Sequence, residues 1–165
     1  MPALSAGTVA PDFTLKSMEG DTFSLFEAIN QGPVVLAFFK ITCPVVQYTF
    51  PFLERIYRAA KGNGVRVVGI SQNTKEDTAL FLREYGVTFP VLLDDPNRYA
   101  ASNAYGITNV PTLFYVDSSG EIRLSSVGWL RADMEQINLM LADAANMPVR
   151  PVFHPGEEVA DWRAG

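Results

Sequence analysis

The only cysteine of the chain, Cys43, follows an apolar segment and directly precedes a proline. Residues 34–39 form an uninterrupted apolar run, which is typical of a strand buried on both faces of a parallel sheet. Pro44 is favoured in the first turn of a helix, where the missing N–H of proline costs nothing. The sequence therefore predicts that Cys43 lies at the N-terminus of a helix, just after a buried strand.

A cysteine at this position would be a reactive nucleophile. At a helix N-terminus the sulfur faces unpaired backbone N–H groups and the positive end of the helix dipole, and both favour the thiolate over the thiol. Lys40, just upstream, would add to this effect. The alternative is a cysteine that packs as a small buried hydrophobic side chain, which is the commoner state of a lone cysteine. The placement of Cys43 favours the nucleophile.

A strand–helix–strand unit is expected to position the cysteine. The helix that begins at Pro44 has apolar residues three and four apart and should end at Gly62. Pro51 lies inside this helix and should kink it, because proline lacks the N–H and contacts the previous turn. A second buried strand follows at residues 65–70.

The remaining segments predict a mixed α/β fold. A hairpin of residues 13–15 and 22–25 should cover one edge, and a second hairpin joins residues 112–116 and 122–127. Helices are expected at residues 74–85, 98–105 and 132–145, with a short strand at 91–93. The packing side of the last helix is predicted to carry Met134, Ile137, Leu141, Ala144 and Ala145. The pattern indicates an α/β sandwich with a mixed central sheet, as one domain over residues 1–146.

Residues 147–165 form a proline-containing tail that is expected to be extended. Two readings of the tail stay open. Its Trp162 favours docking on the domain, and its composition is equally compatible with an unstructured end. His154 in this tail is expected to be a surface histidine.

Composition excludes several classes of partner. The chain has 165 residues and a formal net charge of −5, without the basic cluster that binding to nucleic acid or to anionic membranes needs. No segment is apolar for long enough to span a membrane, and no leader is visible, so a cytoplasmic location is expected. With one cysteine and one histidine, neither an internal disulfide nor a structural zinc site is expected, and no cofactor is predicted. No oligomeric state is predicted.

Four segments together resemble the thioredoxin fold, and most closely the thioredoxin-like proteins of the TlpA/ResA type, grouped with the redoxin and AhpC/TSA families. They are the strand that runs into Cys43-Pro44, and residues 50–54, 85–94 and 105–112, within a resemblance over residues 8–146. The resemblance implies a thioredoxin-like three-layer sandwich and thiol-disulfide oxidoreductase activity on disulfide-containing proteins or small disulfides. It also implies that Pro111 is cis and that Val110 pairs with substrate backbone, with Thr42 and Pro44 beside them as further substrate-binding residues.

The departures from this family are at the site itself. Members carry Cys-x-x-Cys, in which the second thiol resolves the mixed disulfide, but here the resolving position is Val46. The acidic groups that assist the family fall at Ala37 and Thr49. An external thiol, from a protein or glutathione, must therefore resolve any mixed disulfide at Cys43. Val46 is either a natural feature or an engineered replacement of a cysteine.

Two other functions remain as alternatives. One is a one-cysteine thiol peroxidase of the peroxiredoxin type, in which peroxide oxidises Cys43 to a sulfenic acid. The peroxiredoxin signature calls for proline and threonine where this chain has Leu36 and Lys40, and for arginine where it has Pro111. The other is a redox-inactive thioredoxin-fold module that binds peptides. We expect the disulfide-exchange function.

Overall fold

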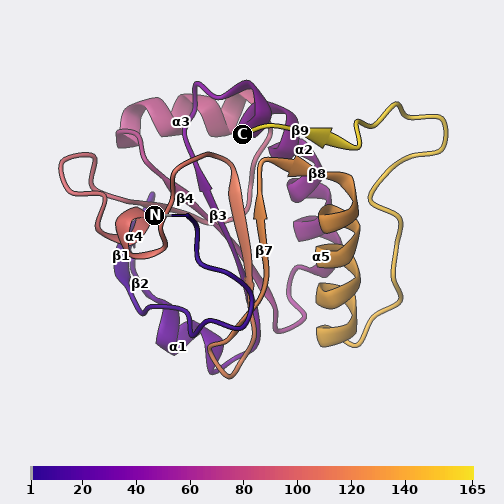
Figure 1. The fold of residues 1–165 in the computed structure, drawn as a ribbon, viewed down its shortest axis with the longest axis horizontal. Helices are drawn as coiled ribbons and strands as arrows, with labels where there is room; N and C mark the ends of the chain where they lie inside the picture. The colour runs from indigo at the N-terminus through magenta and orange to yellow at the C-terminus, as the bar shows by residue number, and fades with distance from the viewer. Residues whose placement is uncertain (1) are drawn as a thin grey trace.

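A mixed sheet covered by helices forms the centre of the computed structural model, which describes residues 2–165 (Figure 1). The strands of this sheet are β1 (Thr14–Ser17), β2 (Thr22–Ser24), β3 (Val34–Phe39), β4 (Arg66–Ser71), β5 (Val91–Leu93), β6 (Thr112–Val116) and β7 (Ile122–Val127). The helices are α1 (Leu25–Ile29), α2 (Pro44–Ala60), α3 (Lys75–Glu84), α4 (Ala100–Ala104) and α5 (Arg131–Ala144). A separate two-stranded sheet consists of β8 (Trp129–Leu130) and β9 (Trp162–Arg163).

The order of the strands is β2-β1-β5-β4-β3-β6-β7, with β3 near the middle. β3 runs parallel to β4 and antiparallel to β6, and all six of its residues are fully buried. Because side chains alternate along a strand, its odd-numbered residues pack with α2, α3 and α5, whereas its even-numbered residues pack with α1 and α4. The predicted three-layer α/β sandwich with a mixed sheet is confirmed.

The predicted connections are also confirmed. β3, α2 and β4 form the expected strand–helix–strand unit, and α2 continues as one helix through Pro51. The β1–β2 hairpin lies at one edge of the sheet, as expected, and the predicted β6–β7 hairpin forms the other edge.

Two details differ from the expectations. The short helix α1, with Ser24 as its N-cap, was not predicted, because five residues are too few to show a helical period. In α5 the predicted packing residue Ala144 is exposed, and Ala142 is buried in its place. Ala144 lies on the same side of α5 as Ile137 and Leu141, but it is the last residue of the helix, and the buried stripe ends before it at Leu141 and Ala142.

The tail docks on the domain, which was one of its two open readings. Val152 is buried, and the Trp129 Nε1–H donates to the Ala160 carbonyl at 2.6 Å. The Arg55 guanidinium forms a bidentate ion pair with Glu157, with both N···O distances 2.8 Å. The indole of Trp162 is 63% exposed, so backbone pairing in β9, and not burial of this side chain, holds the end of the tail.

Candidate active site

Cys43 lies where the sequence predicts it, at the N-cap of α2. Its backbone is extended (φ −80°, ψ 119°), Pro44 begins the helix, and the Cys43 carbonyl accepts the first helical hydrogen bond from Gln47 N–H at 3.1 Å. The thiol is free and half-buried, so reagents in solution can reach it. Lys40 and Thr42 are exposed on the loop between β3 and α2.

The sulfur contacts a loop that is distant in the sequence. The Cys43 thiol donates to the Val110 carbonyl at 3.3 Å, and the Val110–Pro111 peptide bond is cis. Val110 and Pro111 are buried, whereas Thr42 and Pro44 are exposed on either side of Cys43. The structure therefore brings together Cys43, Val110 and Pro111, with Thr42 and Pro44 at the rim, as the family resemblance implies.

Two polar side chains fix the loop before Cys43. Asn73 Oδ1 accepts from the Ile41 N–H at 2.9 Å, and Gln47 Nε2–H donates to the Ile41 carbonyl at 3.0 Å. Asn73 follows β4, the parallel neighbour of β3, so it lies at the same end of the sheet. The sequence analysis missed both residues, although a polar residue at the carboxyl end of a parallel strand is a usable signal.

The position of a second thiol is occupied by an apolar side chain. Val46 lies in the first turn of α2 and is fully buried. Ala37 and Thr49 are also fully buried, and the Thr49 hydroxyl donates to the Val45 carbonyl at 2.7 Å. None of these side chains can exchange a proton with Cys43 at neutral pH.

The carboxylate that α2 does bury, Glu54, lies three turns beyond Cys43, about 16 Å along the helix. Burial raises the pKa of Glu54, but hydrogen bonds from Thr88, Arg58 and Phe89 outweigh burial and lower it. Its acceptor oxygens hold the segment before β5, with Thr88 N–H at 2.8 Å and Phe89 N–H at 3.2 Å. Glu54 therefore has a structural role and is no proton donor for Cys43.

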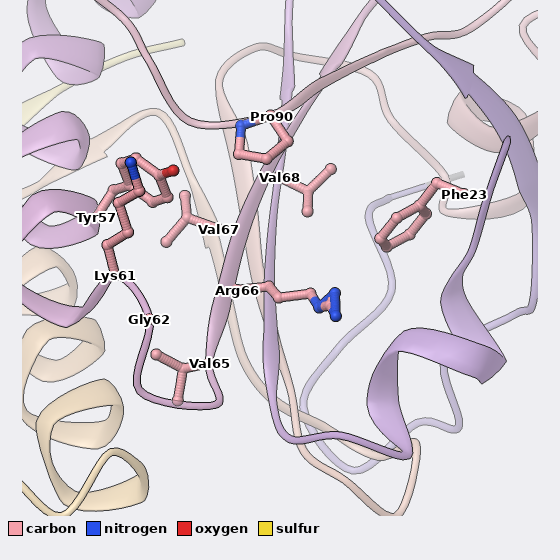
Figure 2. A pocket seen from close by; sticks show the side chains of 9 residues that line it. All are labelled: Phe23, Tyr57, Lys61, Gly62, Val65, Arg66, Val67, Val68 and Pro90. Carbon is pink, nitrogen blue, oxygen red and sulfur yellow. The ribbon is translucent and has the colours of Figure 1, made fainter. Parts of the chain in front are cut away.

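A hollow at the other end of α2 offers no comparable chemistry (Figure 2). It exists because β5 begins at Val91, opposite Gly69, so the start of β4 has no neighbouring strand on this side within residues 2–165. Its two cationic side chains already have partners, since Lys61 Nζ lies 5.9 Å from the Tyr57 ring centroid and Arg66 is hydrogen-bonded to Gln31. The hollow is lined by Phe23, Tyr57, Lys61, Gly62, Val65, Arg66, Val67, Val68 and Pro90.

Comparison with known proteins decides the family. The model of the AhpC/TSA family matches residues 6–125 of the chain. The chain belongs to the AhpC/TSA family. This AhpC/TSA protein is 32% identical over 130 residues to the thiol-disulfide oxidoreductase ResA of Halalkalibacterium halodurans, an alignment that covers 78% of this chain and 72% of that protein. The predicted family is therefore confirmed.

Solved structures agree with this assignment of the AhpC/TSA protein. A candidate thiol:disulfide interchange protein DsbE from Chlorobium tepidum superimposes with a TM-score of 0.75 at 28% identity, over 87% of this chain and 99% of that one. The peroxidoxin BcpB of Mycobacterium tuberculosis also superimposes, with a TM-score of 0.69 over 87% of this chain and 97% of that one. At 18% identity, the second likeness shows the shared fold alone.

Proposed function

We propose that this AhpC/TSA-family oxidoreductase exchanges thiols and disulfides through Cys43 alone. The observation that carries the proposal is the position of the sulfur, at the N-cap of α2 and 3.3 Å from the carbonyl of Val110, the residue that precedes the cis proline Pro111. The name of the Halalkalibacterium halodurans relative supports the same reaction class.

The chemistry is a thiolate displacement. The Cys43 thiolate attacks one sulfur of a substrate disulfide, so that a bond forms between Cys43 and that sulfur while the substrate S–S bond breaks. The second substrate sulfur leaves as a thiolate. Cys43 lies at the positive end of the α2 dipole, which favours the attacking thiolate, and the backbone of Val110 would align an extended substrate segment.

The resolving step must come from outside the chain. Because Val46 has no sulfur, a second thiol, from glutathione or a reduced protein, attacks the Cys43 sulfur of the mixed disulfide and restores the free thiolate. We place this cycle of mixed-disulfide formation and resolution in the cytosol, where thiol reductants are abundant. Within residues 2–165, no helix combines the length and the apolar character that a membrane crossing requires.

A direct test is the formation of a mixed disulfide. We expect oxidised glutathione to give a single glutathione adduct on the wild-type protein by intact mass, and a thiol reductant to remove it. The Cys43→Ser variant should give no adduct. A protein that stays unmodified at glutathione disulfide concentrations that modify an unfolded cysteine peptide would contradict the proposal, and unchanged partner binding by Cys43→Ser would favour the binding-module alternative.

A further inference from the structure

The end of the tail lies against the same loop as the reactive sulfur. We propose that residues 160–165 cover the surface formed by Cys43 and the Val110–Pro111 loop and shield Cys43 from protein substrates until the tail moves away. The functional meaning of this inference rests on the proposed function, because the surface that the tail covers is the one that would receive a substrate disulfide.

Contacts at the last residue place the tail beside the sulfur. A Cβ atom added at Gly165 would lie 2.7 Å from the Val110 carbonyl oxygen, which is the oxygen that accepts the Cys43 thiol proton at 3.3 Å. Asn109 Nδ2–H donates to the Gly165 oxygen at 3.1 Å. Because these contacts converge on Val110 and its neighbour, a substrate segment and the tail would compete for the same backbone. In Figure 1 the end of the chain lies close to the start of α2.

Gly128 permits this close approach. Its backbone N–H donates to the Pro111 carbonyl at 2.8 Å, so it lies directly beside the cis proline. A Cβ atom at Gly128 would lie 2.6 Å from the Arg163 carbonyl oxygen and 2.8 Å from the Gly165 nitrogen. With φ +76°, the position also favours glycine for its own backbone. The tail therefore crosses the backbone at Gly128, where no side chain intervenes, next to the cis proline.

Three further contacts hold the tail in this place. β9 pairs antiparallel with β8, the Arg163 guanidinium lies 4.3 Å from the ring centroid of Tyr48, and the Tyr48 hydroxyl accepts from Ala160 N–H at 3.0 Å. Tyr48 is on α2, little more than one turn after Cys43, so these contacts hold the tail beside the start of the helix that carries the thiol. All residues from 161 to 165 are nevertheless exposed, and β9 has only two residues. Such a short, exposed segment can open locally while the domain stays folded.

The position of the tail can be tested by crosslinking. In Ala164→Cys, at an exposed position of the tail that already carries a Cβ atom, the new thiol should form an intramolecular disulfide with Cys43 when oxidised glutathione accepts the two electrons, and intact mass should then show a loss of two hydrogens. The matched control is Ala144→Cys, at an exposed position at the C-terminal end of α5, which Figure 1 shows at the opposite end of this helix from β8, β9 and the end of the chain. We expect the first variant to crosslink at least tenfold faster; equal rates would overturn the inference.

Shielding can be tested independently of disulfide exchange. Alkylation by maleimide needs only a free thiol, so N-ethylmaleimide and a maleimide attached to a ten-residue peptide compare access for small and large reagents. We expect Arg163→Ala, which removes the cation–π contact with Tyr48, to react about two- to fivefold faster with the peptide reagent and unchanged with N-ethylmaleimide. The exposed Arg98→Ala is the control.

The outcomes separate the two proposals. Equal rates of wild type and Arg163→Ala with the peptide reagent would overturn shielding, even if mixed disulfides form. Faster alkylation of Arg163→Ala together with no mixed disulfide on either protein would support shielding and overturn the proposed function.

Discussion

Glu54 joins the helix that carries Cys43 to the segment before β5, and its removal should be costly. The side chain is 5% exposed and accepts hydrogen bonds from Thr88 N–H, Phe89 N–H and Arg58 Nε at 2.8, 3.2 and 2.6 Å. Glu54→Ala leaves the N–H of Phe89 without an acceptor in a buried site. A buried donor without a partner costs about 1–3 kcal/mol. We therefore expect Glu54→Ala to lower the free energy of unfolding by about 2–4 kcal/mol at pH 7.

Glu54→Gln should be much milder. Its amide oxygen can still accept from Thr88 N–H and Phe89 N–H, and the change removes the charge and the oxygen that accepts from Arg58 and from the Thr88 hydroxyl. The ion pair between Glu54 and the exposed Arg58, four residues apart, is worth about 0.3–0.5 kcal/mol. We therefore expect Glu54→Gln to lower the free energy of unfolding by about 1 kcal/mol in total.

The effect of pH follows from the lowered pKa of Glu54. Because the folded pKa lies below the ordinary value of 4.5, the stabilisation by the carboxylate is complete above that pH and is lost as the pH falls through the folded pKa. The difference in stability between wild type and Glu54→Gln should therefore be constant from pH 8 to about pH 5.5 and shrink below the unfolded pKa.

Urea unfolding of the three proteins at pH 7, 5 and 3 measures these differences, with the exposed Glu84→Gln as a control. An alanine variant within about 0.5 kcal/mol of wild type at pH 7, or a glutamine variant as unstable as the alanine variant, would show that the Glu54 hydrogen bonds do not hold the segment before β5.

Three more predictions concern the site and its supports. Val46→Cys should form a disulfide with Cys43, since both residues belong to the first turn of α2, and should catalyse turnover of a protein disulfide with dithiothreitol; absence of turnover would exclude a disabled dithiol enzyme. Gly32→Ala should cost about 2–4 kcal/mol in thermal unfolding, because its Cβ would lie 1.9 Å from a backbone oxygen, whereas Gly62→Ala has free space and should cost about 1 kcal/mol. Equal losses of stability in Gly32→Ala and Gly62→Ala would contradict this steric explanation. Tyr48→Phe should cost about 1 kcal/mol through its lost hydrogen bond to the tail and speed alkylation by the maleimide peptide; unchanged alkylation would speak against tail docking.

The position of Cys43 could be predicted because its signals are local. The buried run before it and Pro44 after it each restrict the backbone within a few residues, and the structure has the strand and the helix in those places. The contact with Val110, in contrast, spans 67 positions of the chain, and the family resemblance implied only a cis Pro111 and a Val110 backbone that pairs with substrate.

Other features depend on packing that the sequence does not display. Glu54 and Arg58 read as a surface pair four residues apart, and only the loop at Thr88 makes the carboxylate buried. The path of the tail is set by backbone pairing in two-residue strands, which carry no periodic pattern. Trp162 is the residue that suggested docking, yet its side chain faces solvent.

A competition experiment tests whether Cys43 is a nucleophile for disulfides. The wild-type protein is offered equal concentrations of oxidised glutathione and hydrogen peroxide, and intact mass with a sulfenic-acid trap follows both products over time. We predict that the glutathione adduct on Cys43 dominates and that peroxide reacts no faster than with a free thiolate of cysteine. Rapid, saturable formation of the trapped sulfenic acid, with little glutathione adduct, would contradict the account and identify a peroxidase.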